Sequence, residues 1–250
     1  MNAWSRRLIF YALLLGAWQA CAALHVWPSF LFPSPASVLS SLADGLHNGT
    51  LLIGITASLT RLLIGYLLSL AIGLPLGVLV GSKRWLEQTV GSLLLGLQTL
   101  PSICWLPLAL LWFGLNERAI IFVVVMGAML SISLAAEDGV KNTPPLYLRA
   151  ARNMGATGWR LYTQVIFPAS LPSIVTGMKL GWSFAWRALM AGELLYGNSG
   201  LGQLLMTGRE LNDMSQVLAV MVVIVVLGLL VDRLAFAPIE RRVRTQWGLA

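Results

Sequence analysis

Six long apolar segments run through this 250-residue chain, and they constrain its fold more than any other feature. They cover residues 8–26, 62–81, 88–113, 119–136, 172–195 and 214–234. A helix needs about 20 residues to cross the hydrocarbon core of a bilayer, and backbone polar groups in that core must be satisfied within the segment. We therefore predict an all-α membrane protein, with a single domain over residues 1–250 and six transmembrane helices.

The composition agrees with a lipid environment. Hydrophobic residues make up 57% of the chain, charged residues only 11%, and the mean hydropathy is +0.77; about a quarter of a soluble domain is charged. The net charge of +7 does not indicate nucleic acid, because no basic patch is interleaved with aromatic residues. Cys21 and Cys104 both lie in apolar segments, so they predict ordinary packing and no metal site.

The distribution of basic residues predicts the orientation. With the N-terminus in the cytoplasm, twelve of the seventeen Lys and Arg residues fall on the cytoplasmic side, and only Arg118 and Arg209 fall outside. This bias follows the positive-inside rule, so both termini are predicted to be cytoplasmic. An alternative is that residues 6–22 form a cleaved secretory signal, since Arg6 and Arg7 precede an apolar stretch and a small-residue site. The five further segments favour a retained first helix.

Small residues recur every four positions in two of the segments. They are Gly65, Ser69, Gly73, Gly77 and Gly81 in the second segment, and Gly177 and Gly181, between Ser173 and Ala185, in the fifth. Residues at this spacing lie on one side of a helix, where small side chains let two backbones approach closely. We predict that both stripes are helix-packing surfaces.

Several ionisable residues lie within or beside the apolar segments, where charge is costly and usually functional. Lys179, Ser183, Arg187 and Met190 share a helix face, and Glu193 follows on the same segment. We predict that these five residues line a translocation path, in which Arg187 could attract an anion. The alternative is a structural ion pair of Arg187 with Glu193 or with another helix. Arg61 is expected to reach the outer interface by extending its side chain.

A polar loop at residues 137–168 separates the fourth and fifth segments. Thr143 is predicted to cap a helix that begins at Pro144, runs through 146–154 and ends at Gly155 in the left-handed conformation. A second short helix is predicted at 158–164. Ala150, Ala151 and Gly155 would leave a low surface that a groove of another protein could enclose.

At this loop the chain resembles the permease subunits of bacterial ABC importers. Their hallmark is Glu-Ala-Ala, three residues, Gly, and then a stretch that ends in Leu-Pro. The matching residues here are Ala150-Ala151, Gly155, Ile166-Phe167-Pro168 and Leu171-Pro172. The nitrate, sulfonate and taurine branch is indicated by Leu100-Pro101, Trp105-Leu106-Pro107-Leu108, Trp112-Phe113-Gly114, Glu193-Leu194-Leu195 and Gly200-Leu201-Gly202.

The resemblance implies a type I ABC importer permease fold, in which this loop docks on an ATP-binding subunit. The coupling helix would comprise Tyr147, Leu148, Arg149, Ala150, Ala151, Arg152, Met154, Gly155 and Ala156, and the loop would re-enter the membrane at Pro168, Leu171 and Pro172. Arg149 departs from the hallmark, which has glutamate at its position. We expect the partner surface opposite Arg149 and Arg152 to be acidic or neutral.

The resemblance also implies the partners and the location. They are a second copy of the chain, two copies of a cytoplasmic ATP-binding subunit and an extracytoplasmic substrate-binding protein, all at the bacterial inner membrane. The chain contains no Gly-Lys dipeptide, hence no phosphate-binding loop, and no HExxH or GxSxG motif. We therefore expect no enzyme activity and no cofactor in this chain, while ATP and Mg²⁺ are used by the partner.

The predicted cargo is a small organic or inorganic anion such as a sulfonate, taurine or nitrate. A vitamin precursor or another neutral or cationic solute is the alternative for a permease of this branch. A secondary transporter driven by an ion gradient is a rival class, although the chain lacks the internal repeat that such transporters commonly have.

Overall fold

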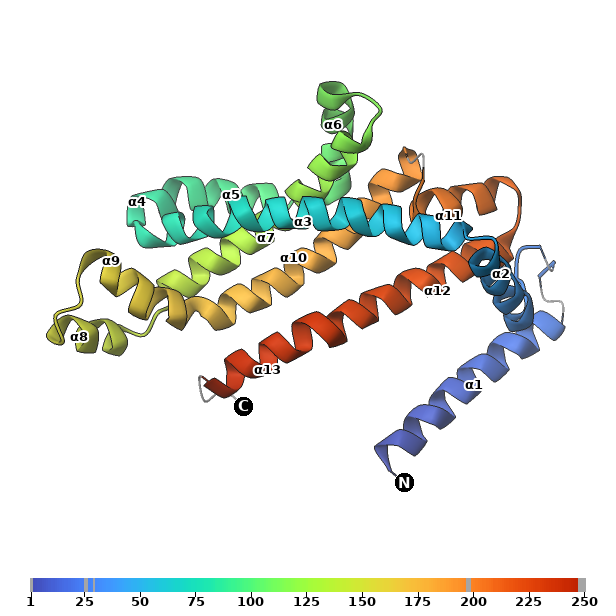
Figure 1. The fold of residues 1–250 in the computed structure, drawn as a ribbon, viewed down its shortest axis with the longest axis horizontal. Helices are drawn as coiled ribbons and strands as arrows, with labels where there is room; N and C mark the ends of the chain where they lie inside the picture. The colour runs from blue at the N-terminus through green and yellow to red at the C-terminus, as the bar shows by residue number, and fades with distance from the viewer. Residues whose placement is uncertain (1, 25–26, 29, 197–198, 247–250) are drawn as a thin grey trace. The chain divides into compact units, whose positions relative to one another are not determined.

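The structure is a computed structural model that describes residues 2–24, 27, 28, 30–196 and 199–246. Across these residues all regular structure is helical (Figure 1). The chain divides into two compact units. The first comprises Met1–Ser58 and Gly197–Leu227, and the second comprises Leu59–Tyr196 and Gly228–Ala250. Residues 25 and 26, at the end of the first predicted span, lie outside the described residues.

The first unit contains α1 (Ala3–Ala23), α2 (Pro35–His47), the start of α3 (Thr50–Ser82), α11 (Leu201–Glu210) and most of α12 (Met214–Val231). Helix α2 begins after Ser34, whose hydroxyl accepts a hydrogen bond from the Ser37 N–H at 3.2 Å. Proline at the first helical position suits this start because its missing N–H would be unpaired there. The Ser58 hydroxyl accepts the Leu201 N–H at 2.9 Å and so joins α3 to α11.

The second unit is built on α7 (Glu117–Lys141) and α10 (Phe167–Leu195), which pack along each other (Figure 1). The other elements are the rest of α3, α4 (Arg84–Leu86), η1 (Glu87–Gly91), α5 (Ser92–Gln98), η2 (Ser102–Trp105), α6 (Leu106–Phe113), α8 (Pro145–Asn153), α9 (Gly158–Leu161), η3 (Tyr162–Ile166), η4 (Asp232–Phe236) and α13 (Ala237–Gln246). Segments η1, η3 and η4 are π-helical and continue their neighbouring helices without a break.

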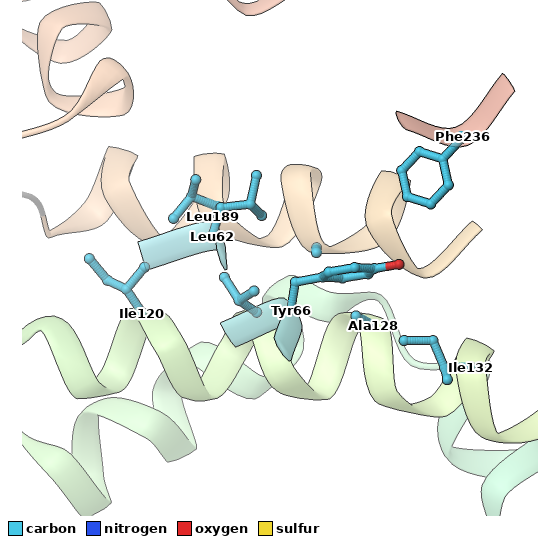
Figure 2. Close-up of a cluster of buried hydrophobic side chains, with 9 residues drawn as sticks. Leu62, Tyr66, Ile120, Ala128, Ile132, Leu189 and Phe236 are labelled. Carbon is cyan, nitrogen blue, oxygen red and sulfur yellow. The ribbon is translucent and has the colours of Figure 1, made fainter. Parts of the chain in front are cut away.

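The core of the second unit lies where α3, α7 and α10 meet. Figure 2 shows Leu62 and Tyr66 of α3 with Ile120 of α7 and Leu189 of α10 in one apolar cluster. The Tyr66 hydroxyl donates a hydrogen bond to the Met178 carbonyl at 2.8 Å, which satisfies the polar end of a buried ring. The three helices are therefore joined by apolar packing and by one interhelical hydrogen bond from a tyrosine.

The small residues of α3 lie against α7. A Cβ atom at Gly77 would lie 2.1 Å from the Ser133 carbonyl oxygen, and one at Gly73 would lie 2.9 Å from the Met129 carbonyl oxygen. On α10, a Cβ atom at Gly177 would lie 2.1 Å from the Cβ of Ala135. Only a hydrogen atom fits at these positions, so the backbones approach as closely as small residues allow.

Three described helices are long and apolar enough to cross a membrane: α3, α7 and the continuous helix Met214–Val243. The pair Arg84–Gln98 and Ser102–Phe113 adds a fourth if it counts as one span, although it is bent by 101° at residues 99–101. Helices α1 and α10 are 21 and 29 residues long. Helix α10 carries Lys179, Arg187 and Glu193, which reduces its apolar character.

Two local predictions in the polar loop are wrong. Thr143 does not cap α8: its hydroxyl donates to the Gly139 carbonyl at 3.3 Å, and the cap position is Pro144. Pro145 is the first residue of α8, because the second of two prolines suits that position. The helix predicted at 158–164 does not end there either, since the chain is helical from Gly158 to Leu195. The π-helical turn η3 precedes Pro168, which lies in the first turn of α10.

Candidate functional site

Helix α8 is held to the second unit by one of its faces. Ala151 is only 3% exposed and packs with Val140 of α7, Leu161 of α9 and Ile166 of η3. Leu148 and Ala156 are partly buried against the same cluster. The hairpin of α8 and α9 therefore has its own small apolar core at the end of α7 and α10, and Figure 1 shows it there.

The end of α8 is fixed by glycine. Gly155 adopts φ +86°, as predicted, in the left-handed region that favours glycine. The Ala156 N–H donates to the Ala151 carbonyl at 2.9 Å, and the Gly155 N–H donates to the Arg152 carbonyl at 3.0 Å. This pair of bonds is the Schellman arrangement, which satisfies the last carbonyl groups and turns the chain sharply into α9.

The opposite face of α8 is exposed. Arg149 lies two residues before the buried Ala151, which on a helix of 3.6 residues per turn is nearly the opposite side. Large apolar side chains are also exposed on this hairpin, most of all Leu146 at 71%, Met154 at 81% and Trp159 at 81%. The sequence predicted a low surface made by both alanines, but only Ala150 is exposed and Ala151 faces inward.

Arg61 differs from its prediction. It does not extend to an interface but is 4% exposed, and its guanidinium holds two carboxylates. Its Nη1 donates to Glu193 Oε1 at 2.9 Å, and its Nη2 lies 2.7 Å from Glu117 Oε1. Glu193 is 1% exposed, whereas Glu117 is open to the surroundings. This network joins the start of α7 and the end of α10 to α3 through a charge that is paired inside the unit.

Lys179 is also paired. Its Nζ lies 2.8 Å from Asp232 Oδ1 and 3.6 Å from Glu240 Oε2, which links α10 to η4 and α13. The side chains of Lys179 and Asp232 are each about two-fifths exposed. Lys179 and Glu193 therefore both have partners on other helices.

Arg187 lies between them on the exposed side of α10. Its guanidinium donates to the Ser183 carbonyl at 3.2 Å and to the Ser183 hydroxyl at 3.3 Å, and it stands 4.6 Å above the ring centre of Phe184. The ion pair of Arg187 with Glu193, one of the two alternatives from the sequence, is not formed. Met190 is half-buried and packs against the core cluster of Figure 2. Among the five path candidates, Ser183 and Arg187 therefore contact each other. The other three, Lys179, Met190 and Glu193, contact different neighbours.

The predicted span 88–113 is interrupted by Pro101, and the helix is broken there in the structure. The helix is bent by 101° there, and a cavity of about 130 Å³ lies at the bend. Gln98 and Ser102 contribute to it from the bent segment, and Ser131 contributes from α7. Pro101, which cannot continue a helix with a regular hydrogen bond, was the available signal for this bend. In the described part of the chain no cluster of His, Cys, Asp and Glu could hold a metal ion.

Comparisons with known proteins place these features in a context. The chain is 35% identical over 227 residues to a putative ABC transporter permease protein of Methanocaldococcus jannaschii, covering 89% of this chain and 85% of that protein. It is 29% identical to the taurine transport system permease protein of Escherichia coli, over 94% and 87% of the two chains. It is 30% identical to the nitrate import permease protein of Synechocystis, over 91% and 85%.

A solved structure shares the fold. A chain of the MetNI methionine ABC transporter in an inward-facing conformation superposes with a TM-score of 0.69 at 24% identity, covering 79% of this chain and 97% of that one. The sequence profile of the binding-protein-dependent transport system inner membrane component matches residues 73–245, which include the α8 hairpin, the bent helix and all of α10. The chain therefore belongs to that family of membrane transport components.

Proposed function

We propose that this chain is the permease subunit of an ATP-driven importer and forms the path of a small anion across the bacterial inner membrane. Two copies would form the path, two ATP-binding subunits would drive it from the cytoplasm, and an extracytoplasmic binding protein would deliver the solute. This chain would carry out no chemical reaction and bind no cofactor. ATP and Mg²⁺ would be used by the ATP-binding subunits.

The observation that carries this proposal is the α8–α9 hairpin. Its inner face is packed around Ala151, while Leu146, Met154 and Trp159 are exposed on the same hairpin. Exposed apolar side chains that gather on one polar loop are typical of protein–protein contacts. Arg149 and Arg152 are exposed on the same helix, which favours an acidic or neutral partner surface.

Six membrane spans with both ends in the cytoplasm would put the hairpin on the side of the ATP-binding subunits. In this arrangement α1 and α10 would add to the helices that are apolar enough on their own, and the bent pair α5–α6 would count as one span. The arrangement is supported by the excess of Lys and Arg in the segments assigned to the cytoplasm.

An anion is the proposed cargo for two reasons. Relatives of this chain transport taurine or import nitrate, as their names state. On α10, Lys179 and Glu193 have oppositely charged partners, whereas the contacts of Arg187 are with Ser183 and Phe184. Because Arg187 has no ion pair with a carboxylate among the residues that the structure describes, its guanidinium can bind an anionic group without first losing one.

The docking role can be tested with Leu146→Asp. Aspartate in the first turn of α8 is favourable for the helix dipole, so this change should leave the helix intact while it places a charge on the proposed contact. We expect the variant to insert normally but to lose the ATP-binding subunit on copurification, and ATP-driven uptake of taurine or nitrate with it. Leu39→Asp is the matched control, because Leu39 is 70% exposed on α2, far from the hairpin in sequence.

If Leu146→Asp captures the ATP-binding subunit and supports uptake as well as Leu39→Asp does, the docking role of the hairpin is wrong. Uptake by the purified chain alone, driven by an ion gradient without an ATP-binding subunit, would contradict the importer assignment itself.

A further inference from the structure

The cavity at the bend between α5 and α6 has four polar side chains, Gln98, Thr99, Ser102 and Ser131, in a mostly apolar lining. Its volume is about 130 Å³, and residues of α7 and Phe184 of α10 line its other sides. The lining residues that can contact a polar solute or stack on it are Gln98, Thr99, Ser102, Trp105, Ser131 and Phe184. Sites for drug-sized ligands occupy about 300–1,000 Å³, so this one is suited only to a small solute.

Gln98 is the polar residue that points to a ligand. Its Nε2 donates a hydrogen bond to Ser131 Oγ at 3.3 Å, while its Oε1 is enclosed and has no hydrogen-bond partner. If the amide is turned over, the nitrogen becomes the unpaired atom, so one polar atom of Gln98 is left over in both orientations. A buried polar atom without a partner destabilises the fold unless something binds it.

The broken backbone at residues 98–102 also favours a bound solute. Gln98 to Ser102 fall in the middle of the predicted span 88–113, where lipid cannot satisfy stray polar groups. Irregular backbone at this depth is tolerated where it is covered by protein or lines a polar cavity, and broken helices of membrane transporters bind solutes at such places. Here α7 and α10 cover the bend, and the cavity lies between them and the broken helix.

A positive charge lies next to one residue of the cavity lining. Phe184 forms part of the cavity lining, and the Arg187 guanidinium lies over the Phe184 ring at 4.6 Å. No ion pair of Arg187 with a carboxylate occurs in the part of the chain that the structure describes. The guanidinium offers several N–H groups in a planar fork that suits an oxyanion.

We propose that this cavity, with Arg187 beside it, is a binding site for a small oxyanion within the permease itself. The guanidinium would hold the sulfonate or nitrate oxygens, and Gln98, Ser102 and Ser131 would form hydrogen bonds with the rest of the solute. The inference rests on the proposed transport function and adds a solute site that is separate from the binding protein. It predicts that the permease selects its cargo a second time.

The experiment measures binding without the binding protein. The complex of this chain with its ATP-binding subunit, in lipid nanodiscs, is titrated with radiolabelled taurine and with labelled nitrate. We expect at least one of them to bind, and Gln98→Leu and Arg187→Gln each to weaken that binding on the order of tenfold, since each removes a hydrogen-bonding or charged partner of the solute. Leucine at position 98 removes the unpaired oxygen together with the hydrogen bond to Ser131, so these two effects on stability oppose each other and the fold should be kept.

Gln88→Leu is the matched control, because Gln88 is exposed in the same continuous helix, Arg84–Gln98, but does not line the cavity. Binding should be unchanged in this variant. The proposal is overturned if neither solute binds to the complex, or if Gln98→Leu binds as tightly as Gln88→Leu. ATP-driven uptake by the natural chain with its binding protein would in either case still support the transport function, so the two failures can be told apart.

Discussion

The contact of α3 with α7 gives a prediction whose magnitude can be worked out from the structure. In Gly77→Ala the new Cβ atom would lie 2.1 Å from the Ser133 carbonyl oxygen and 2.7 Å from the Ala136 Cβ. The carbonyl oxygen belongs to the backbone of α7 and cannot rotate away as a side chain could. The two helices must therefore separate by about 1 Å at this point, because overpacked atoms in a rigid interior have to move.

Separation of the helices weakens more than one contact. A gap of 0.5–1 Å forfeits about a quarter to a half of the attraction of each atom pair, and Gly73 and Gly81 lie on the same stripe. Overpacking of this kind costs typically about 1–3 kcal/mol, and we expect Gly77→Ala to lie near the upper end. Alanine is otherwise better than glycine in a helix by about 1 kcal/mol, so the packing cost must exceed that gain.

Gly96→Ala is the control. Gly96 is also helical, in α5, and a Cβ atom there would meet nothing within 4 Å. Thermal unfolding of the detergent-purified complex should show Gly77→Ala below the natural chain, and Gly96→Ala equal to it or above. If Gly77→Ala is as stable as Gly96→Ala, the close approach of α3 and α7 is wrong.

Two further predictions concern charge and coupling. Arg61→Met should lower the stability of the complex by about 3–5 kcal/mol, because it leaves the buried Glu193 carboxylate without its guanidinium. The double variant Arg61→Met with Glu193→Leu should recover most of the loss in the same melting assay. If Arg61→Met alone is as stable as the natural chain, this reasoning is wrong. Replacement of Thr163 and Gln164, both exposed in η3, by glycine should soften the helix by about 1 kcal/mol per residue. We expect ATP hydrolysis to persist in reconstituted vesicles while uptake per ATP falls, and alanine at both positions to restore it; equal uptake per ATP in the two variants would refute the idea.

The elements that hydropathy and turn chemistry decide were predictable. Gly155 takes its positive φ because the chain must reverse between α8 and α9, and glycine is the residue that does so without strain. The apolar run 62–81 forms part of α3 because a lipid-facing segment of this length satisfies its backbone only as a helix. These inferences need nothing beyond the local sequence.

The pairing of charges was not predictable in the same way. Glu117 lies 56 residues after Arg61 along the chain, and Glu193 lies 132 residues after it. Nothing in the local sequence indicates that the three side chains meet. The sequence therefore offered Glu193, the nearest carboxylate, only as one possible partner of Arg187, whereas in the structure Glu193 pairs with Arg61 of α3. The cavity at Gln98 was missed for the same reason, since Ser131 and Phe184 come to it from α7 and α10.

Helix α10 carries three charged residues and connects the α8–α9 hairpin to the proposed anion site. Lys179 ties the middle of the helix to η4 and α13, and Glu193 ties its end to Arg61 of α3, whereas Arg187 has no ion pair with a carboxylate in the described part of the chain. Helix α10 continues α9 and η3, so the chain is helical without interruption from Gly158, in the α8–α9 hairpin, to Leu195. At 1.5 Å per residue, about 40 Å of helix separates the hairpin from Arg187. A displacement of the hairpin by a docked partner would therefore reach the proposed anion site through one rigid element, and the ion pairs of Lys179 and Glu193 would set how far that element can move.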